Sequence, residues 1–286
     1  MSSGPAGHVT RSFNSPHLET APRTPSRRFL RTVDGVTIDA AYEPGTTPSG
    51  DLAIVVAHGF TGDLDRPHVR RAAGVLARSA AVVTFSFRGH GASGGSSTVG
   101  DREVHDLAAA VAWARELGHP RVATVGFSMG GSVVLRHAAI HRNAGHPAQK
   151  HEGRTEAHPD AVVSVSAPAR WYYRGTAPMR RLHWLVTRPV GRAVGRYGLR
   201  TRIHHRDWDP VPASPAESVP LIAPTPLLIV HGDQDGYFPV DHPKMLAEAS
   251  GGHAGLWLEH GMGHAENAAD DELLARIGDW AVAHAG

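Results

Sequence analysis

A serine lies between two glycines at the point where an expected strand meets an expected helix. The sequence there reads Gly126-Phe127-Ser128-Met129-Gly130; it follows the apolar run 121–125 and precedes the helix-like run 131–139. Strand, G-x-S-x-G and helix in this order are typical of a nucleophile elbow, a sharp turn that exposes its serine at the carboxyl end of the strand. The glycines leave space where side chains would meet the neighbouring strand and helix. Ser128 is therefore a candidate nucleophile.

Apolar runs alternate with segments of helical spacing along most of the chain. Each run is short and continuous, as expected for a strand that is buried on both faces of a sheet. Strands that alternate with helices favour right-handed β-α-β units and a mostly parallel sheet. An alternating pattern around Asp34-Gly35 also predicts a hairpin over residues 28–42. The expected strands are 52–57, 81–87, 121–125, 160–167, 227–230 and 256–258, and the expected helices are 66–79, 101–117, 131–139, 241–250 and 271–284.

Composition narrows the class of protein and of partner. The chain has 286 residues, enough for one large α/β domain or two small ones, and its 41% hydrophobic residues are ample for a buried core. The formal net charge of +2 implies no polyelectrolyte partner, which argues against nucleic acid. The sequence contains no cysteine, which excludes disulfides, a thiol nucleophile and thiolate metal sites.

The beginning of the sequence differs in character from the rest. Residues 1–26 are rich in Ser, Pro, Gly and His and lack the apolar core of a signal peptide, so we expect a disordered tail. No apolar run is long enough to span a membrane, and with no export signal visible the expected location is the cytoplasm. Residues 27–286 make up the expected folded domain.

A serine nucleophile needs a base within hydrogen-bond reach and an acid that orients the base. Functional groups of an open parallel sheet collect at the carboxyl ends of its strands, so these partners should follow later strands. Asp233 and Asp235 both follow the strand 227–230. We favour Asp235, because Asp233 directly follows a glycine and suits a local turn or cap.

The candidate base is His264, at the end of Gly261-Met262-Gly263-His264. The chain has 21 histidines, so a single one carries little weight, and His260 and His253 are the nearest rivals. His264 differs from them because it lies in a glycine-flanked loop between a strand and a helix. It also completes the order Ser…Asp…His, the order found where a nucleophile elbow supplies the serine.

An oxyanion hole would need two backbone N–H groups. The N–H of Met129 lies at the start of a helix, where the amide dipoles point at developing negative charge. The loop His58-Gly59-Phe60-Thr61-Gly62 follows the strand 52–57, and the N–H of Phe60 is the best candidate for the second donor. His58 would then hold the loop through bonds to backbone groups.

These motifs together resemble the α/β-hydrolase superfamily, and the resemblance covers most of residues 36–286. The matching stretches are HGFTG at 58–62, FRGHGASGG at 87–95, GFSMGG at 126–131, HGDQDGYFP at 231–239 and GMGH at 261–264. The resemblance implies a three-layer sandwich, with a mostly parallel sheet of about eight strands, helices on both faces and a short cap insertion. It implies Ser128 as nucleophile, Asp235 as acid, His264 as base, and Phe60 and Met129 as oxyanion donors. Some members place the acid after the preceding strand, but residues 166–168 offer no carboxylate here.

The activity implied is hydrolysis of carboxylic esters through an acyl-enzyme, without metal or organic cofactor. The sequence is similar to carboxylesterase, cinnamoyl esterase and monoacylglycerol-lipase-like members. A peptidase or thioesterase would use the same triad, and a perhydrolase or acyltransferase stays open. A dehalogenase or epoxide hydrolase is disfavoured, because those members carry aspartate at the nucleophile position. A ligand-binding protein without catalysis is the alternative from another class.

The regular alternation breaks between residues 169 and 218, where arginines, aromatics and prolines accumulate. One or two short helices are expected over 178–197. The superfamily inserts a cap at this place, which would sit over the site and select the substrate. Arginines and aromatics also suit nucleic acid, an alternative that the nearly balanced net charge disfavours. The expected partner is a small-molecule ester, with an acyl chain or an aromatic acid against the apolar residues and an anionic leaving group near the arginines. Nothing in the sequence indicates an oligomeric state.

Overall fold

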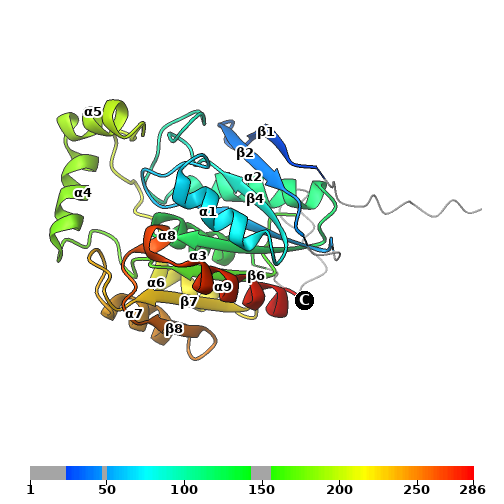
Figure 1. Cartoon of the computed structure of the whole chain (residues 1–286). Coiled ribbons are helices and arrows are strands. Elements are labelled where there is room, and N and C mark those ends of the chain that lie inside the picture. Colours follow the sequence, from blue (N-terminus) through cyan, green and yellow to red (C-terminus); the bar gives the residue numbers. More distant parts are fainter. Residues whose placement is uncertain (1–23, 47–49, 143–155) are drawn as a thin grey trace, which may run out of the picture.

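The computed structural model describes residues 24–46, 50–142 and 156–286, so most of the tail expected over 1–26 lies outside the described residues. Eight strands form one sheet in the order β1-β2-β4-β3-β5-β6-β7-β8 (Figure 1). The sheet is parallel from β4 to β8, whereas β1 and β2 add an antiparallel edge. The strands are β1 (Ser26–Arg31), β2 (Thr37–Glu43), β3 (Leu52–Ala57), β4 (Ala81–Phe85), β5 (Arg121–Phe127), β6 (Ala161–Val165), β7 (Leu227–Gly232) and β8 (Gly255–Glu259).

The predicted hairpin is present as β1 and β2. Leu30 pairs with Ile38, and Gly35 at the turn has a φ of +82°, a left-handed conformation that glycine adopts without strain. The expected mostly parallel sheet of about eight strands is thus confirmed, with the hairpin supplying its antiparallel part.

Helices cover both faces of the sheet (Figure 1). Those over one face include α2 and α3, and those over the other include α1 and α9. The helices are α1 (Pro67–Leu76), α2 (Glu103–Glu116), α3 (Met129–Ile140), α4 (Ala177–Thr187), α5 (Pro189–Gly198), α6 (Pro215–Ser218), α7 (Asp241–Ala249), α8 (Ala265–Ala268) and α9 (Asp271–His284), with a 3₁₀ turn η1 (Val219–Leu221). In the described ranges, no helix is long and apolar enough to cross a membrane.

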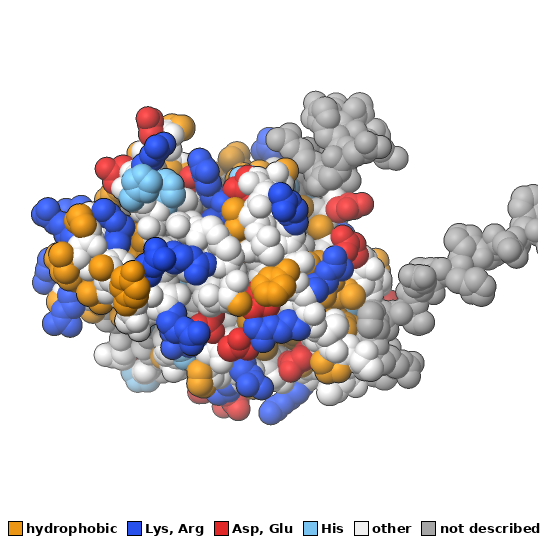
Figure 2. Space-filling view, turned by 90° about the horizontal axis from the view of Figure 1, so that it is seen from above, with side chains coloured by type: hydrophobic (Ala, Val, Ile, Leu, Met, Phe, Trp, Pro, Cys, Tyr) orange, Lys and Arg blue, Asp and Glu red, His pale blue; other side chains and the backbone are white. Residues whose placement is uncertain are grey.

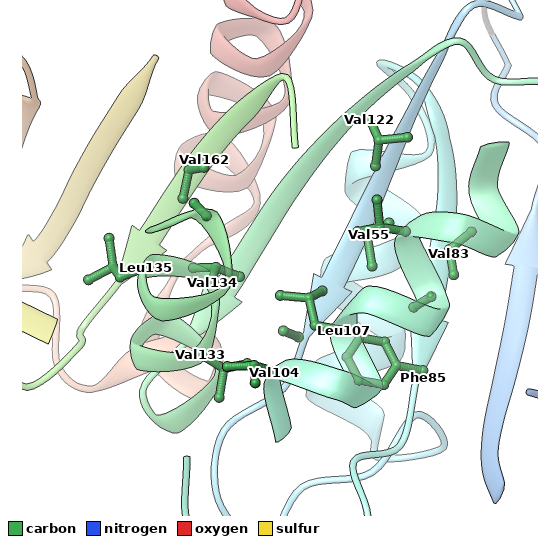
Figure 3. Packing of buried hydrophobic residues seen from close by; sticks show 14 of the residues in the cluster. Val55, Val83, Phe85, Val104, Leu107, Val122, Val133, Val134, Leu135 and Val162 are labelled. Carbon is green, nitrogen blue, oxygen red and sulfur yellow. The ribbon is translucent and has the colours of Figure 1, made fainter. Parts of the chain in front are cut away.

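The two faces of the sheet have separate cores because side chains of a strand alternate between faces. In β3, Val55 contributes to the core under α2 and α3, whereas its neighbours Ile54 and Val56 contribute to the core under α1 and α9. Figure 3 shows Val55 and Val83 from the strands on the same side as Leu107 of α2 and Val134 of α3. This arrangement is the predicted three-layer sandwich.

The segment 169–218 contains two helices that are not part of these layers. Figure 1 shows α4 and α5 standing beyond one end of the sheet, α5 above α4. After α5 the chain returns to the body through two short bridges, from Thr201 to His90 and from Ile203 to Ser97. We call α4 and α5 with their connection the helical lobe.

Candidate active site

Ser128 lies in a sharp backbone turn whose strained conformation is held by its neighbours. It occupies the single position between β5 and α3, and its φ of +53° is a left-handed value that costs a non-glycine residue energy. Its N–H donates to Val165 O at 2.8 Å. A Cβ at Gly126 would overlap the carbonyl oxygen of Gly130, and one at Gly130 would overlap that of Ala57. The glycines of the motif are therefore required by close backbone packing.

Ser128, His264 and Asp235 form a continuous chain of hydrogen bonds. His264 Nε2 lies 2.9 Å from Ser128 Oγ, and His264 Nδ1 lies 2.8 Å from Asp235 Oδ2. Because a carboxylate can only accept, Nδ1 carries the proton and Nε2 is free to accept that of the serine. The structure thus brings together the three side chains selected from the sequence.

Asp235 is fixed by further bonds. Its Oδ1 accepts from the backbone N–H groups of Tyr237, at 2.8 Å, and Phe238, at 3.1 Å. Burial raises the pKa of this carboxyl, but the hydrogen bonds from His264 and from the two amides outweigh burial and hold that pKa below its ordinary value. Asp235 is consequently ionised at neutral pH and can stabilise a charged imidazole.

The rival residues occupy other positions. Asp233 binds His260 Nδ1 and the N–H of Gly261, both at 2.7 Å, and the His260 side chain is 95% exposed. His253 donates to the Thr225 carbonyl at 2.7 Å. Neither rival histidine is hydrogen-bonded to Ser128 within the described part of the chain.

The loop that contains Phe60 is held from three sides. His58 Nδ1 donates to Gly59 O at 2.7 Å, and His58 Nε2 accepts from the N–H of Phe87 at 3.0 Å, which is the structural role expected for it. Glu266 Oε1 accepts from the N–H of Gly59 at 2.9 Å, and His90 Nε2 accepts from that of Thr61 at 3.3 Å. The backbone of Phe60 is thereby fixed between anchored neighbours.

Both candidate oxyanion donors lie beside the serine. Met129 is the first residue of α3, and the first N–H groups of a helix have no partner inside the helix. Phe60 and Met129 line the same cavity as Ser128. Their N–H groups remain the candidate oxyanion donors of the site.

Three contributors to the site carry no clear signal in the sequence. The buried Glu266 anchors Gly59 from a position 207 residues later in the chain. The Tyr237 ring stacks on that of His264 with centroids 4.2 Å apart. Ser166 Oγ accepts from the N–H of Ala265 at 3.1 Å, which ties β6 to the residue after the histidine. Only Tyr237 could have been suspected, because it lies two residues after the acid.

Two cavities meet at Ser128. The first has a volume of about 540 Å³, and its walls include Trp171, Tyr173 and Trp208. The second has a volume of about 700 Å³, and its walls include His264 and Arg181. Side chains that line both cavities, and so lie between them, are Phe60, Met179, Leu182 and Phe238. Among residues 24–46, 50–142 and 156–286, no group of three or more His, Asp or Glu side chains could hold a metal ion.

Comparison with known proteins agrees with this fold. The family model described as alpha/beta hydrolase fold matches residues 53–150. The chain is 29% identical to the monoacylglycerol lipase of Mycolicibacterium smegmatis over 232 residues, which are 72% of this chain and 78% of that protein.

Solved structures extend the likeness to nearly the whole chain. The Pyrococcus furiosus esterase Pf2001 superposes with a TM-score of 0.68 at 20% identity, over 98% of this chain and 99% of that one. Est1E of Butyrivibrio proteoclasticus, solved with ferulic acid bound, superposes with a TM-score of 0.58 at 18% identity, over 90% and 99% of the two chains. Sheet order and these matches together show that the chain has the α/β-hydrolase fold and is similar to esterases and lipases of that fold.

Proposed function

We propose that this chain is a serine hydrolase that cleaves carboxylic esters through an acyl-enzyme intermediate. The observation that carries the proposal is the hydrogen-bonded chain from Ser128 through His264 to Asp235, placed where two cavities meet. The names of two similar proteins, a monoacylglycerol lipase and an esterase, point to the same class of reaction.

The proposed reaction proceeds in two halves. As Ser128 Oγ attacks the ester carbonyl, its proton passes to His264 Nε2, and Asp235 stabilises the resulting imidazolium. The N–H groups of Phe60 and Met129 donate to the oxyanion, a contribution for which one donor is typically worth about 3–4 kcal/mol. The proton on His264 then passes to the leaving alcohol. In the second half, water gives a proton to the same nitrogen and releases the acid from the serine.

The two cavities divide the substrate. The leaving alcohol must lie within reach of the proton on His264 Nε2, so it occupies the second cavity, which His264 lines. The acyl group then occupies the first cavity, whose walls include the aromatic rings of Trp171, Tyr173 and Trp208. Such walls suit a medium acyl chain or an aromatic acid, and Arg181 beside the second cavity suits an anionic alcohol. The segment 169–218 acts in this proposal as the cap, because it supplies walls to both cavities.

A fluorophosphonate probe tests the nucleophile. Wild-type protein should react covalently, and Ser128→Ala should not. His264→Ala should lose turnover by several orders of magnitude, whereas His260→Ala should retain it. A folded wild type that does not react would instead favour the ligand-binding alternative, and loss of turnover in His260→Ala alone would overturn the choice of base.

A substrate panel tests the bond that is cleaved. Matched esters, thioesters and amides with aromatic and medium-chain acyl groups should show the highest kcat/KM for the esters. A preference for amides or thioesters would reassign the chain to a peptidase or thioesterase with the same triad. The expected cytoplasmic location stays a prediction that cell fractionation can check.

A further inference from the structure

Helix α5 presents its apolar side chains to solvent. Val190, Val194 and Tyr197 follow the i, i+4, i+7 spacing of one helix face, and their exposed fractions are 66%, 46% and 80%. An amphipathic helix of a globular protein normally turns such a face to the core. Exposed apolar surface gathered on one face marks a place where something else binds.

The opposite side of α5 explains this orientation. Its buried residues are Gly191 and Gly195. A Cβ at Gly191 would lie 2.5 Å from the carbonyl oxygen of Trp184, and one at Gly195 would lie 3.0 Å from the Ile203 side chain. The helix thus packs inward through glycines at close range, and its larger apolar side chains are left on the outside.

The charge of the helical lobe is of one sign. Residues 177–198 contain five arginines and no Asp or Glu. Figure 2 shows Lys and Arg side chains next to apolar ones at the end of the molecule that carries the helical lobe. The guanidinium of Arg196 lies 5.7 Å from the centre of the Tyr197 ring, so cation and apolar face are immediate neighbours.

We propose that the apolar face of α5, defined by Val190, Val194 and Tyr197, docks onto a lipid bilayer that contains anionic lipids. An apolar helix face beside arginines is the pattern of helices that lie in the membrane interface, with the apolar side chains among the acyl chains and the cations at the headgroups. Each Lys or Arg near an anionic surface adds about 1 kcal/mol, or roughly fivefold in affinity, and the lobe has no acidic residue to oppose this.

Other occupants fit less well. A second copy of the chain, meeting the same face symmetrically, would bring two arginine-rich surfaces together, and like charges facing each other oppose association. Nucleic acid would use the arginines, but phosphates and bases offer nothing to the two exposed valines. A bilayer with anionic headgroups satisfies both features at once.

Docking would place the second cavity beside the bilayer. Helix α4 precedes α5 with Arg188 alone between them, and its residues Arg181, Trp184 and Leu185 line the second cavity. The Trp184 side chain is itself 47% exposed. The face proposed to bind lipid and the cavity wall therefore belong to one continuous unit.

Cosedimentation of the full-length protein with vesicles tests the proposal. Wild type should bind vesicles of equal parts phosphatidylglycerol and phosphatidylcholine. Its binding to vesicles of pure phosphatidylcholine should be at least tenfold weaker. Binding should also weaken as salt is raised. The triple variant V190S/V194S/Y197S should lose binding at least tenfold, and R188Q/R196Q should lose it about tenfold or more at low salt.

Matched controls separate docking from catalysis and from folding. The triple variant V33S/L258S/V282S removes three exposed apolar side chains elsewhere on the molecule and should bind vesicles like wild type. The α5 triple variant should hydrolyse a soluble short-chain ester as wild type does, because its three positions line neither cavity. S128A should bind vesicles unchanged, so a failure of the proposed hydrolysis would leave docking measurable.

Three results would overturn the proposal. Wild type could fail to bind anionic vesicles, or the α5 triple variant could bind them as well as wild type does. Alternatively, the α5 triple variant could abolish a concentration-dependent dimer or binding to a single-stranded oligonucleotide while vesicle binding persists. That last result would assign the face to a second copy or to nucleic acid.

Discussion

Lowering the pH from 8 to 5.5 should destabilise this protein through its buried histidines, three of which accept hydrogen bonds from backbone N–H groups. His58 and His90 accept backbone N–H groups at Nε2, and His242 Nδ1 accepts the N–H of Ala169 at 2.9 Å. A proton added to the accepting nitrogen would face another hydrogen, so each ring must stay neutral in the fold. Burial, the largest effect in each case, lowers the pKa to about 3 for His58 and to about 4 for His90 and His242.

The sign follows from proton binding in the two states. The unfolded chain has a histidine pKa of about 6.5, so between about pH 6.5 and 4 it binds more protons than the folded chain, and stability falls as pH falls. At pH 5.5 each imidazole of the unfolded chain is protonated in roughly ten molecules out of eleven. This proton binding lowers the free energy of unfolding by about 1.4 kcal/mol for each histidine. Three of them cost about 4 kcal/mol, a large share of a typical stability of roughly 5–15 kcal/mol.

Asp106 works in the opposite direction. Burial raises its pKa to about 7, although hydrogen bonds from Arg88 oppose that rise. Proton uptake by the folded protein would then offset about 2 kcal/mol of that loss at pH 5.5. Burial also lowers the pKa values of His119, His137 and His231, so these histidines add to the loss. The pKa values of Asp34, Asp160 and Asp235 are lowered, so these carboxylates are ionised in both states at pH 5.5 and do not contribute.

Urea unfolding at both pH values measures the effect, and one variant isolates a single histidine. His242→Gln keeps an acceptor that cannot be protonated in this range, so its loss of stability between pH 8 and 5.5 should be about 1.4 kcal/mol smaller than in wild type. The term from Asp106 cancels in this comparison. His205→Gln, at an exposed ring, is the control for loss of an imidazole as such. Equal pH dependence in wild type and His242→Gln would refute the reasoning.

Two further predictions concern the elbow and the acid. Gly126→Ala should prevent folding or lower the free energy of unfolding by about 3 kcal/mol or more in a denaturant titration, because the new methyl overlaps Gly130 O. Gly74→Ala has open space in α1 and should raise the free energy of unfolding by about 0.5–1 kcal/mol. Asp235→Asn should lower kcat for the best ester by roughly 10⁴-fold, whereas Asp233→Asn, which disturbs only a surface pair, should stay near wild type; similar losses in both would contradict the assigned acid.

The sequence predicts the sheet well because burial on both faces leaves continuous apolar runs. The strand expected over 52–57 has those bounds in the structure. Of the one or two short helices expected over 178–197, the structure has two, on either side of Arg188. The helices α6 and α8 have four residues each, too few for a periodic pattern to appear. A helix of two turns or more shows its buried face as a periodic pattern in the sequence. A shorter helix has no such pattern, so it is recognised only in the folded structure.

The choice of acid and base shows where local sequence stops deciding. In the register of β7 and β8, Gly232 pairs with Glu259, so Asp233 and His260 emerge opposite each other directly beyond the strands. This second Asp–His pair has good geometry but lies on the surface. Asp235 lies two residues after Asp233, and His264 lies four residues after His260. These two side chains reach over the sheet to Ser128. Spacing along each loop, rather than residue type, separates the buried pair from the exposed one.

Helix α5 is the case in which a correct periodic pattern gives the wrong direction. The spacing of Val190, Val194 and Tyr197 would by itself assign them to a core. Direction is decided by Gly191 and Gly195, because a face without side chains allows the helix to approach its neighbours more closely than the valine face could. The approach fixes the glycines inward, and the apolar face is left uncovered by the described residues of this chain. An outward apolar face with arginines around it is therefore a consequence of how the helical lobe packs. Packing within the chain does not constrain the side chains of this face, so we expect binding of the proposed partner to constrain them.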